Sequence, residues 1–261
     1  MADLESYYNK FNENKRLLSR HGQVEYFVTN KYIHDYLFKG AKIADIGAGT
    51  GAYSIALAKE GYDVTAVEYC KCNLGILRAN LKKENVNVKS FLGDCTSLHM
   101  LQDNTFDITL VFGPLYHLHG EEKQLKALEE ARRITKEGGI ILVAYYMNDY
   151  CVVSYGFKDN HIKESLEKGK LNKDFVCTHN EDDLYEPVTV SYINYLLSKT
   201  KLKRIKLVGV DGPTDYMRQV INAMDEDTFC LFKQYCLSIS ERQEMIGACS
   251  HTLDILKKMN Y

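Results

Sequence analysis

Between residues 40 and 146, short apolar runs alternate with helical patterns, and this alternation constrains the fold more than any other feature of the sequence. Apolar runs of strand length lie at 42–46, 63–67, 86–92, 106–112 and 140–146. Helical spacing of apolar residues fills the gaps at 52–59, 71–84 and 121–135. Strands that alternate with helices form βαβ units, so the sequence predicts an α/β fold with a parallel sheet and helices on both faces.

The flanking segments are expected to complete one domain, because a chain of 261 residues can bury a single large core. Residues 1–39 have helical patterns, and 147–183 form a polar excursion. Gly138-Gly139 is expected to break the helix before the fifth strand. Further helices are expected at 187–199 and within 214–246, and further strands at 201–210 and 251–259.

The turn after the first strand carries three glycines in the run Ala44-Asp45-Ile46-Gly47-Ala48-Gly49-Thr50-Gly51. Glycine lets the backbone turn sharply and lets a ligand approach without a Cβ in the way. The helix that follows offers unpaired N–H groups and a partial positive charge at its start. Since ligands of such sheets bind beyond the carboxyl ends of the strands, this turn predicts a site for a carboxylate or a phosphate.

Two cofactors fit this turn equally well at the level of spacing. Gly47-x-Gly49-x-x-Ala52 satisfies the dinucleotide pattern, and Glu68 follows Gly47 by 21 residues, close to the distance expected for a ribose-binding acid. NAD and S-adenosylmethionine both carry an adenosine ribose, so the pattern alone leaves both open.

Four strand ends together resemble one family. Asp45 before the first glycine, with Gly51 two places after the second, resembles the first motif of the class I S-adenosylmethionine-dependent methyltransferases. Val67-Glu68, Leu92-Gly93-Asp94-Cys95 and 106–118 resemble its next three motifs, in order. More narrowly, Gly113-Pro114-Leu115-Tyr116-His117-Leu118 and the segments 17–25 and 246–251 resemble a subgroup of small bacterial methyltransferases.

The resemblance implies a doubly wound, Rossmann-like sheet of seven strands, mostly parallel, with an antiparallel last strand beside the sixth. Residues 1–39 would form an N-terminal helical lid and 40–146 the cofactor-binding core. Residues 147–261 would supply an insertion, the last two strands and the substrate-side helices. All of these would belong to a single methyltransferase domain over 1–261.

The resemblance also implies a cofactor site for S-adenosylmethionine, whose product is S-adenosylhomocysteine. The 47–51 loop would hold the methionyl end, Glu68 both ribose hydroxyls, and Asp94 the exocyclic amine of adenine. Arg20 of the lid would pair with the methionyl carboxylate. The expected cofactor-binding residues are Asp45, Gly47, Ala48, Gly49, Thr50, Gly51, Glu68, Tyr69, Asp94, Cys95, Phe112, Gly113, Tyr8 and Arg20.

Tyr116 and His117 follow the fourth strand, where acceptors lie in this family, and are the expected catalytic residues. Histidine titrates near neutral pH and suits a base, although a packing or capping role explains His117 as well. Asp94 likewise suits the N-cap of a helix at 96–99. No metal is expected, because His117-Leu118-His119 lacks carboxylate neighbours and the chain has no C-x-x-C pair.

The expected acceptor is a small molecule. Lys and Arg number 33 against 35 Asp and Glu, a net charge of −2, which disfavours a general nucleic-acid binder. Adenine N6 methylation would predict Asn/Asp-Pro-Pro-Tyr/Phe where the chain has Gly113-Pro114-Leu115-Tyr116. The basic run 199–206 alternates with apolar residues, as a solvated strand face does. An RNA or protein methyltransferase, a nicotinamide-dependent oxidoreductase and a non-catalytic cofactor-binding regulator are the alternatives.

The expected compartment is the reducing cytoplasm. The N-terminus lacks the basic and apolar regions of a signal peptide, and no apolar run is long enough to span a bilayer. The eight cysteines show no disulfide or zinc spacing, so free thiols are expected. The sequence leaves open whether the protein is a monomer or a homodimer.

Overall fold

The computed structural model describes residues 4–5, 7, 19–178 and 180–259. Seven strands of this described part form one sheet in the order β3-β2-β1-β4-β5-β7-β6. Strands β1 to β5 pair in parallel, and β7 lies antiparallel between β5 and β6, which confirms the predicted fold class. The strands are β1 (Lys42–Ile46), β2 (Asp63–Glu68), β3 (Lys89–Leu92), β4 (Phe106–Val111), β5 (Thr135–Tyr146), β6 (Leu202–Gly209) and β7 (His251–Lys258).

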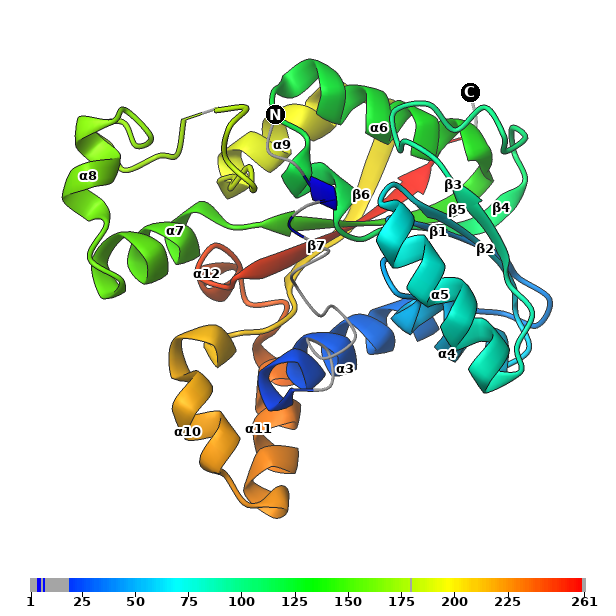
Figure 1. Cartoon of the computed structure of the whole chain (residues 1–261), viewed down its shortest axis with the longest axis horizontal. Helices are drawn as coiled ribbons and strands as arrows, with labels where there is room; N and C mark the ends of the chain where they lie inside the picture. The colour runs from blue at the N-terminus through cyan, green and yellow to red at the C-terminus, as the bar shows by residue number, and fades with distance from the viewer. Residues whose placement is uncertain (1–3, 6, 8–18, 179, 260–261) are drawn as a thin grey trace.

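Helices cover both faces of the sheet (Figure 1). One face packs against α3 (Arg20–His34), α4 (Ala52–Lys59), α5 (Lys71–Glu84), α10 (Arg218–Ala223) and α11 (Glu226–Ile239). The other face packs against α6 (Glu121–Ile134) and α9 (Val190–Ser198). Shorter helical segments are η1 (Pro114–His117), α7 (Asn148–Cys151), η2 (Val152–Lys158), α8 (Ile162–Glu167), η3 (Thr214–Met217) and α12 (Gln243–Ile246).

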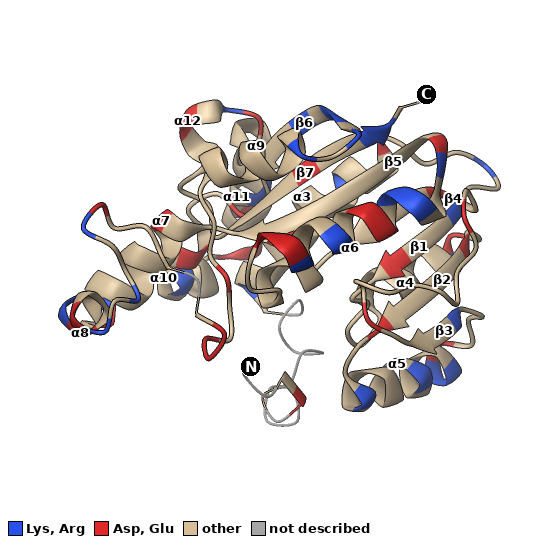
Figure 2. Ribbon diagram, turned by 90° about the horizontal axis from the view of Figure 1, so that it is seen from above, with Lys and Arg blue, Asp and Glu red and all other residues tan. Residues whose placement is uncertain are grey.

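The charges of α6 follow its dipole. Figure 2 shows acidic residues at its start and basic residues at its end, and these are Glu121 and Glu122 in the first turn and Arg132 and Arg133 in the last. Acidic groups near a helix N-terminus and basic groups near its C-terminus stabilise the helix. The bounds of α6 also agree with the helix predicted at 121–135.

Two predicted boundaries are wrong. Gly138-Gly139 does not break the helix: α6 already ends at Ile134, and β5 runs from Thr135 through both glycines. A Cβ on Gly139 would lie 2.8 Å from the Lys136 carbonyl oxygen and 2.9 Å from that of Asp107, so glycine is needed where the β4–β5 register shifts. Helix α9 begins at Val190 rather than at 187, because the Thr189 side chain caps it by accepting from the amide of Tyr192.

The third strand also begins later than expected. Asn85 ends α5 in the left-handed conformation (φ 53°), and the chain turns before β3 starts at Lys89. Asparagine in this conformation commonly ends a helix. The strand was predicted to start at 86 because Val86 is apolar.

The antiparallel end of the sheet contains a buried ion pair. Arg204 of β6 donates from Nε and Nη2 to the two carboxylate oxygens of Asp254 on β7, both at 2.7 Å. The Asp254 side chain is 1% exposed and the Arg204 side chain 23% exposed. This pair therefore joins the two strands that complete the sheet. In the described residues, no helix has the length and hydropathy that crossing a membrane requires.

Candidate functional site

A cavity of about 680 Å³ lies along the carboxyl ends of β1, β2 and β4. Parallel strands bring these ends to one edge, so residues from distant parts of the chain meet there. Helix α3 and the start of β7 contribute to the same wall through Glu25, Thr29 and His251. The expected cofactor residues that line it are Asp45, Gly47, Ala48, Gly49, Thr50, Glu68, Tyr69, Asp94, Cys95, Phe112 and Gly113.

The glycine loop is held against β2 by backbone hydrogen bonds. The amides of Gly47 and Ala48 donate to the Val67 carbonyl oxygen at 2.8 and 3.1 Å. Below the loop, the buried Asp45 carboxylate accepts from the Ser54 hydroxyl at 2.6 Å. Burial raises the pKa of Asp45 to about 6, although the Ser54 hydrogen bond opposes the shift. These hydrogen bonds hold the loop against β2 and α4.

We expect Gly47→Ala to destabilise the fold. Gly47 has a φ of 80°, and an added Cβ would lie 2.5 Å from Pro114 Cδ and 3.0 Å from the Phe112 carbonyl oxygen. Gly61→Ala is the matched control, because its φ of 92° is equally unfavourable but nothing lies within 4 Å of an added Cβ. Urea unfolding should show at least about 1 kcal/mol more destabilisation for Gly47→Ala. Equal losses would mean that the contact with Pro114 carries no constraint.

Glu68 ends β2 with its carboxylate at the cavity wall. Its Oε2 accepts from the Gly49 amide at 2.7 Å and its Oε1 from the Cys70 amide at 2.9 Å. The residue is 6% exposed. Each carboxylate oxygen has more than one lone pair, so these bonds orient Glu68 and leave it able to accept from a ligand.

Asp94 and Cys95 follow β3 on the far side of Glu68. Asp94 Oδ1 accepts from the amide and the hydroxyl of Thr96, both at 2.8 Å. The expected helix at 96–99 is wrong, because this aspartate closes a turn bridged to Ser97 instead. Burial raises the pKa of the Cys95 thiol to about 12, so it is a neutral, apolar part of the wall at pH 7.

Aromatic rings gather at the opposite end of the cavity. The Tyr116 ring lies 5.0 Å from His117, 6.0 Å from Tyr185 and 6.0 Å from His251, measured between ring centroids. His117 Nδ1 lies 2.9 Å from the Leu184 carbonyl oxygen and donates to it. Burial lowers the pKa of His117 to about 4, although that hydrogen bond opposes the shift, so the ring is neutral at pH 7 and a weak base.

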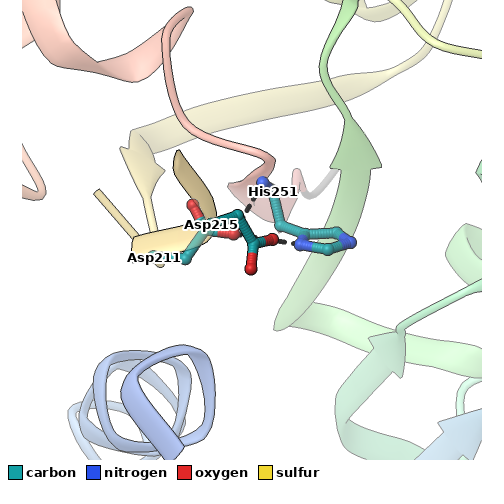
Figure 3. Close-up of side chains that lie close together, drawn as sticks. All are labelled: Asp211, Asp215 and His251. Atoms are coloured by element: carbon teal, nitrogen blue, oxygen red, sulfur yellow. Dashed lines mark hydrogen bonds and ion pairs between the residues drawn. The ribbon is translucent and has the colours of Figure 1, made fainter. Parts of the chain in front are cut away.

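Sequence reasoning missed a histidine and two aspartates at this end. Asp211 follows β6, Asp215 lies on η3, and His251 opens β7 (Figure 3). The imidazole Nδ1 of His251 lies 3.0 Å from Asp211 Oδ2. Because β6 and β7 are antiparallel, the end of one strand meets the start of the next, and this pairing is the signal that would have found them.

Two of the expected cofactor residues that the structure describes, Arg20 and Gly51, do not line the cavity. Tyr8 lies outside the described residues. Arg20 donates from Nη1 to the Met224 carbonyl oxygen at 2.6 Å and lies over the Phe229 ring, so it joins α3 to α11. Gly51 is the N-cap residue of α4 with a φ of 95°, and an added Cβ would lie 3.1 Å from Leu77 Cγ, so the loop packs closely against α5 here.

Comparison with known proteins finds methyltransferases that are similar to part of this chain. Residues 43–139 match the family model of a methyltransferase domain. A demethylmenaquinone methyltransferase of Paenarthrobacter aurescens is 38% identical over 108 residues, which are 41% of this chain and 39% of that relative. Over this region the chain is similar to S-adenosylmethionine-dependent methyltransferases. The cofactor of the family is S-adenosylmethionine.

Other relatives match more of the chain at lower identity. A probable S-adenosyl-L-methionine-dependent methyltransferase, TehB of Haemophilus influenzae, is 26% identical over 166 residues, 60% of this chain and 57% of the relative. The chain thus spans about two fifths to three fifths of the length of these curated relatives. A methyltransferase structure from Methanosarcina mazei has a TM-score of 0.61 at 15% identity, covering 88% of this chain and 98% of that one, and shows the same fold.

Proposed function

We propose that the protein transfers a methyl group from S-adenosylmethionine to a small molecule. The observation that carries this proposal is the Glu68 carboxylate, held at the cavity wall by the amides of Gly49 and Cys70. A fixed carboxylate is the natural acceptor for a pair of ribose hydroxyls. The cavity continues from Glu68 to Tyr116, and its volume of about 680 Å³ suits a nucleoside beside an acceptor.

The remaining cofactor contacts are expected on either side of Glu68. The 47–50 loop and the N-terminal end of α4 offer N–H groups and partial positive charge to the methionyl carboxylate. Asp94 would accept from the adenine amine. Tyr69, Cys95, Phe112 and Gly113 line the cavity with apolar and aromatic surface, which suits a flat base.

Bound in this way, S-adenosylmethionine supplies a methyl group that is already activated on sulfur. The chain's own task is then to hold the acceptor in line at near-attack distance and to exclude water. Tyr116 and His117 form the acceptor wall, and the Glu186 amide holds the segment in place by donating to the Tyr116 carbonyl oxygen at 2.8 Å. This fixed wall supports orientation as the main catalytic contribution.

We also propose that the N-terminal residues close over the cavity as a lid. Leu4 lines the cavity, and Glu5 Oε1 accepts from the Lys71 amide at 3.2 Å. The hydroxyls of Tyr7 and Tyr185 lie 3.3 Å apart, next to the acceptor wall. Contacts with both ends of the cavity support a cover that excludes water.

A small acceptor is favoured over RNA because charged residues of the basic run at 199–206 pair with acidic residues of the same chain. Arg204 pairs with Asp254, and Lys206 donates to Glu241 at 2.6 Å, so these charges already have partners. A relative is named for demethylmenaquinone, and an aromatic wall suits a ring compound of that kind.

All eight cysteines have free thiols, which supports a reducing, cytoplasmic location.

Calorimetric titration with S-adenosylmethionine, S-adenosylhomocysteine and NAD tests the cofactor. We expect the first two to bind and NAD to show no heat of binding; the reverse result would favour the oxidoreductase. Radiolabelled methyl transfer to separate pools of metabolites, bulk tRNA and protein then tests the acceptor. Label in the tRNA or protein pool would overturn the small-molecule assignment. Cofactor binding with no labelled product in any pool would favour a non-catalytic regulator.

A further inference from the structure

His251 lies at the acceptor end of the cavity, where no sequence motif assigned it a role. It is the first residue of β7, and its ring centroid lies 6.0 Å from that of Tyr116 and 5.7 Å from that of Tyr146. It lines the cavity together with Glu25 of α3. The antiparallel insertion of β7 thus brings a titratable ring to the same edge as the glycine loop and Glu68.

Asp211 fixes the orientation of this ring. Its buried carboxylate, 2% exposed, accepts from His251 Nδ1 and from the His251 amide, both at 3.0 Å, and from the Ser250 amide at 3.0 Å. An ionised carboxylate only accepts hydrogen bonds, so Nδ1 carries the proton and Nε2 has the lone pair. Figure 3 shows Nε2 on the side of the ring away from both aspartates.

The second aspartate is occupied by other partners. Asp215 accepts from Arg218 Nε at 2.8 Å and from the Ser250 hydroxyl at 2.6 Å. Burial opposes ionisation of Asp215, but the Arg218 and Ser250 hydrogen bonds lower its pKa. Because Arg218 already neutralises Asp215, these groups match a hydrogen-bonded network around His251 better than a metal site.

We propose that His251, oriented by Asp211, is the general base that takes the proton from the methyl acceptor. This inference rests on the proposed function. It narrows the substrate to compounds whose reacting oxygen or nitrogen carries a proton at neutral pH. The acceptor O–H or N–H bond breaks and its proton goes to His251 Nε2. The electron pair left on the acceptor bonds to the methyl carbon, and the pair of the broken carbon–sulfur bond stays on sulfur as a neutral thioether.

His117 is the competing candidate for this role, since it lies on the same wall. Its Nδ1 donates to the backbone carbonyl of Leu184 rather than to a carboxylate, and burial lowers its pKa to about 4, so its ring is a weak base at neutral pH. The groups that face His251 are instead acidic or neutral: Asp211 and Asp215, Glu25 at 4.0 Å from Nδ1, and the rings of Tyr116 and Tyr146. The negative charges around the ring stabilise its protonated, positively charged form. A general base takes on this form when it accepts the proton of the acceptor.

The first test needs no acceptor. An NMR titration of histidine ring protons should show the His251 midpoint falling by at least about one pH unit in Asp211→Asn, because the variant loses the negative charge beside the ring. The signal is assigned by its absence in His251→Gln. Asparagine keeps one oxygen, which replaces the acceptor of either the Ser250 amide or the His251 amide, because these two amides donate to different oxygens of Asp211. Urea unfolding checks that the variant is folded. An unchanged midpoint would overturn the pairing on which the inference depends.

The second test compares the variants His251→Gln and His117→Gln. Each variant is assayed with a pool of phenols and a pool of amines, chosen because the wild-type protein transfers labelled methyl to them. His251→Gln should lower kcat at pH 7 by about 100-fold or more, with a rate that keeps rising at high pH as the acceptor ionises by itself. His117→Gln should lower kcat less and keep the wild-type pH profile. The Kd for S-adenosylhomocysteine should stay within about twofold in both.

The two proposals fail in different ways. A wild-type kcat and pH profile in His251→Gln would overturn the base assignment and leave the proposed methyl transfer intact. A wild-type protein that binds no S-adenosylhomocysteine, or transfers no methyl to any pool, would overturn the proposed function and this inference with it. Label found in the phenol pool or the amine pool alone then identifies the acceptor atom.

Discussion

Replacing Arg204 with Met should lower the free energy of unfolding by about 3–5 kcal/mol at neutral pH, because it leaves the Asp254 carboxylate buried without its partner. Methionine fills much of the volume of the arginine stem, so the loss reports the charge more than the packing. Urea unfolding at pH 7 measures it. The expected loss is large because Asp254 lies on β7, the strand that joins β5 to β6.

The same substitution should change the dependence of stability on pH. Burial raises the pKa of Asp254 in the folded protein, and Arg204 partly opposes that shift. Without Arg204 the folded pKa rises further above the unfolded value. A raised carboxyl pKa gives stability that is present below the unfolded pKa and is lost as the pH rises through the folded pKa. The difference between wild type and Arg204→Met should therefore shrink as the pH falls toward 4.

Arg132→Met is the matched control for this prediction. Arg132 makes the same two-pronged contact with Glu129 and is also 23% exposed, but the Glu129 side chain is 56% exposed. Pairs whose partner is in solvent contribute about 0–1 kcal/mol. If both variants lost the same stability, burial of Asp254 would not be the cause.

The parallel half of the sheet was predictable from the sequence because its signals are local. Strands β1, β2 and β4 are continuous apolar runs, and each helix between them carries apolar residues at helical spacing. The predicted boundaries of helices and strands were wrong where tertiary contacts, and not the local sequence, determine them. Strand β5 extends back through Gly138 and Gly139 because the bulge beside Asp107 needs a residue without a Cβ.

The part of the cavity wall that was predictable consists of residues at or just after the end of a parallel strand. Gly47, Glu68, Asp94 and Tyr116 are neighbours in sequence of β1 to β4, and parallel pairing brings them to one edge. Their roles stay predictions. The Asp211–His251 pair was not predicted because its partners lie 40 residues apart and meet through an antiparallel strand. The position of Arg20 was not predicted because nothing in its local sequence indicates that Met224 and Glu226 would accept its hydrogen bonds.

Replacing Glu68 with Gln should raise the Kd for S-adenosylhomocysteine about 10- to 100-fold. A carboxylate that accepts from two ribose hydroxyls makes two charge-assisted bonds, each of about 1.5–3 kcal/mol, and glutamine keeps only neutral ones. About 1.4 kcal/mol corresponds to a tenfold change in Kd. Glutamine also retains one oxygen for the Gly49 or Cys70 amide, so the loop should keep most of its support.

Asp63→Asn is the control for Glu68→Gln, because Asp63 is the exposed residue at the opposite end of the same strand. Calorimetry should find its Kd unchanged, and urea unfolding should show that both variants stay folded. A wild-type Kd in Glu68→Gln would remove Glu68 from the ribose site.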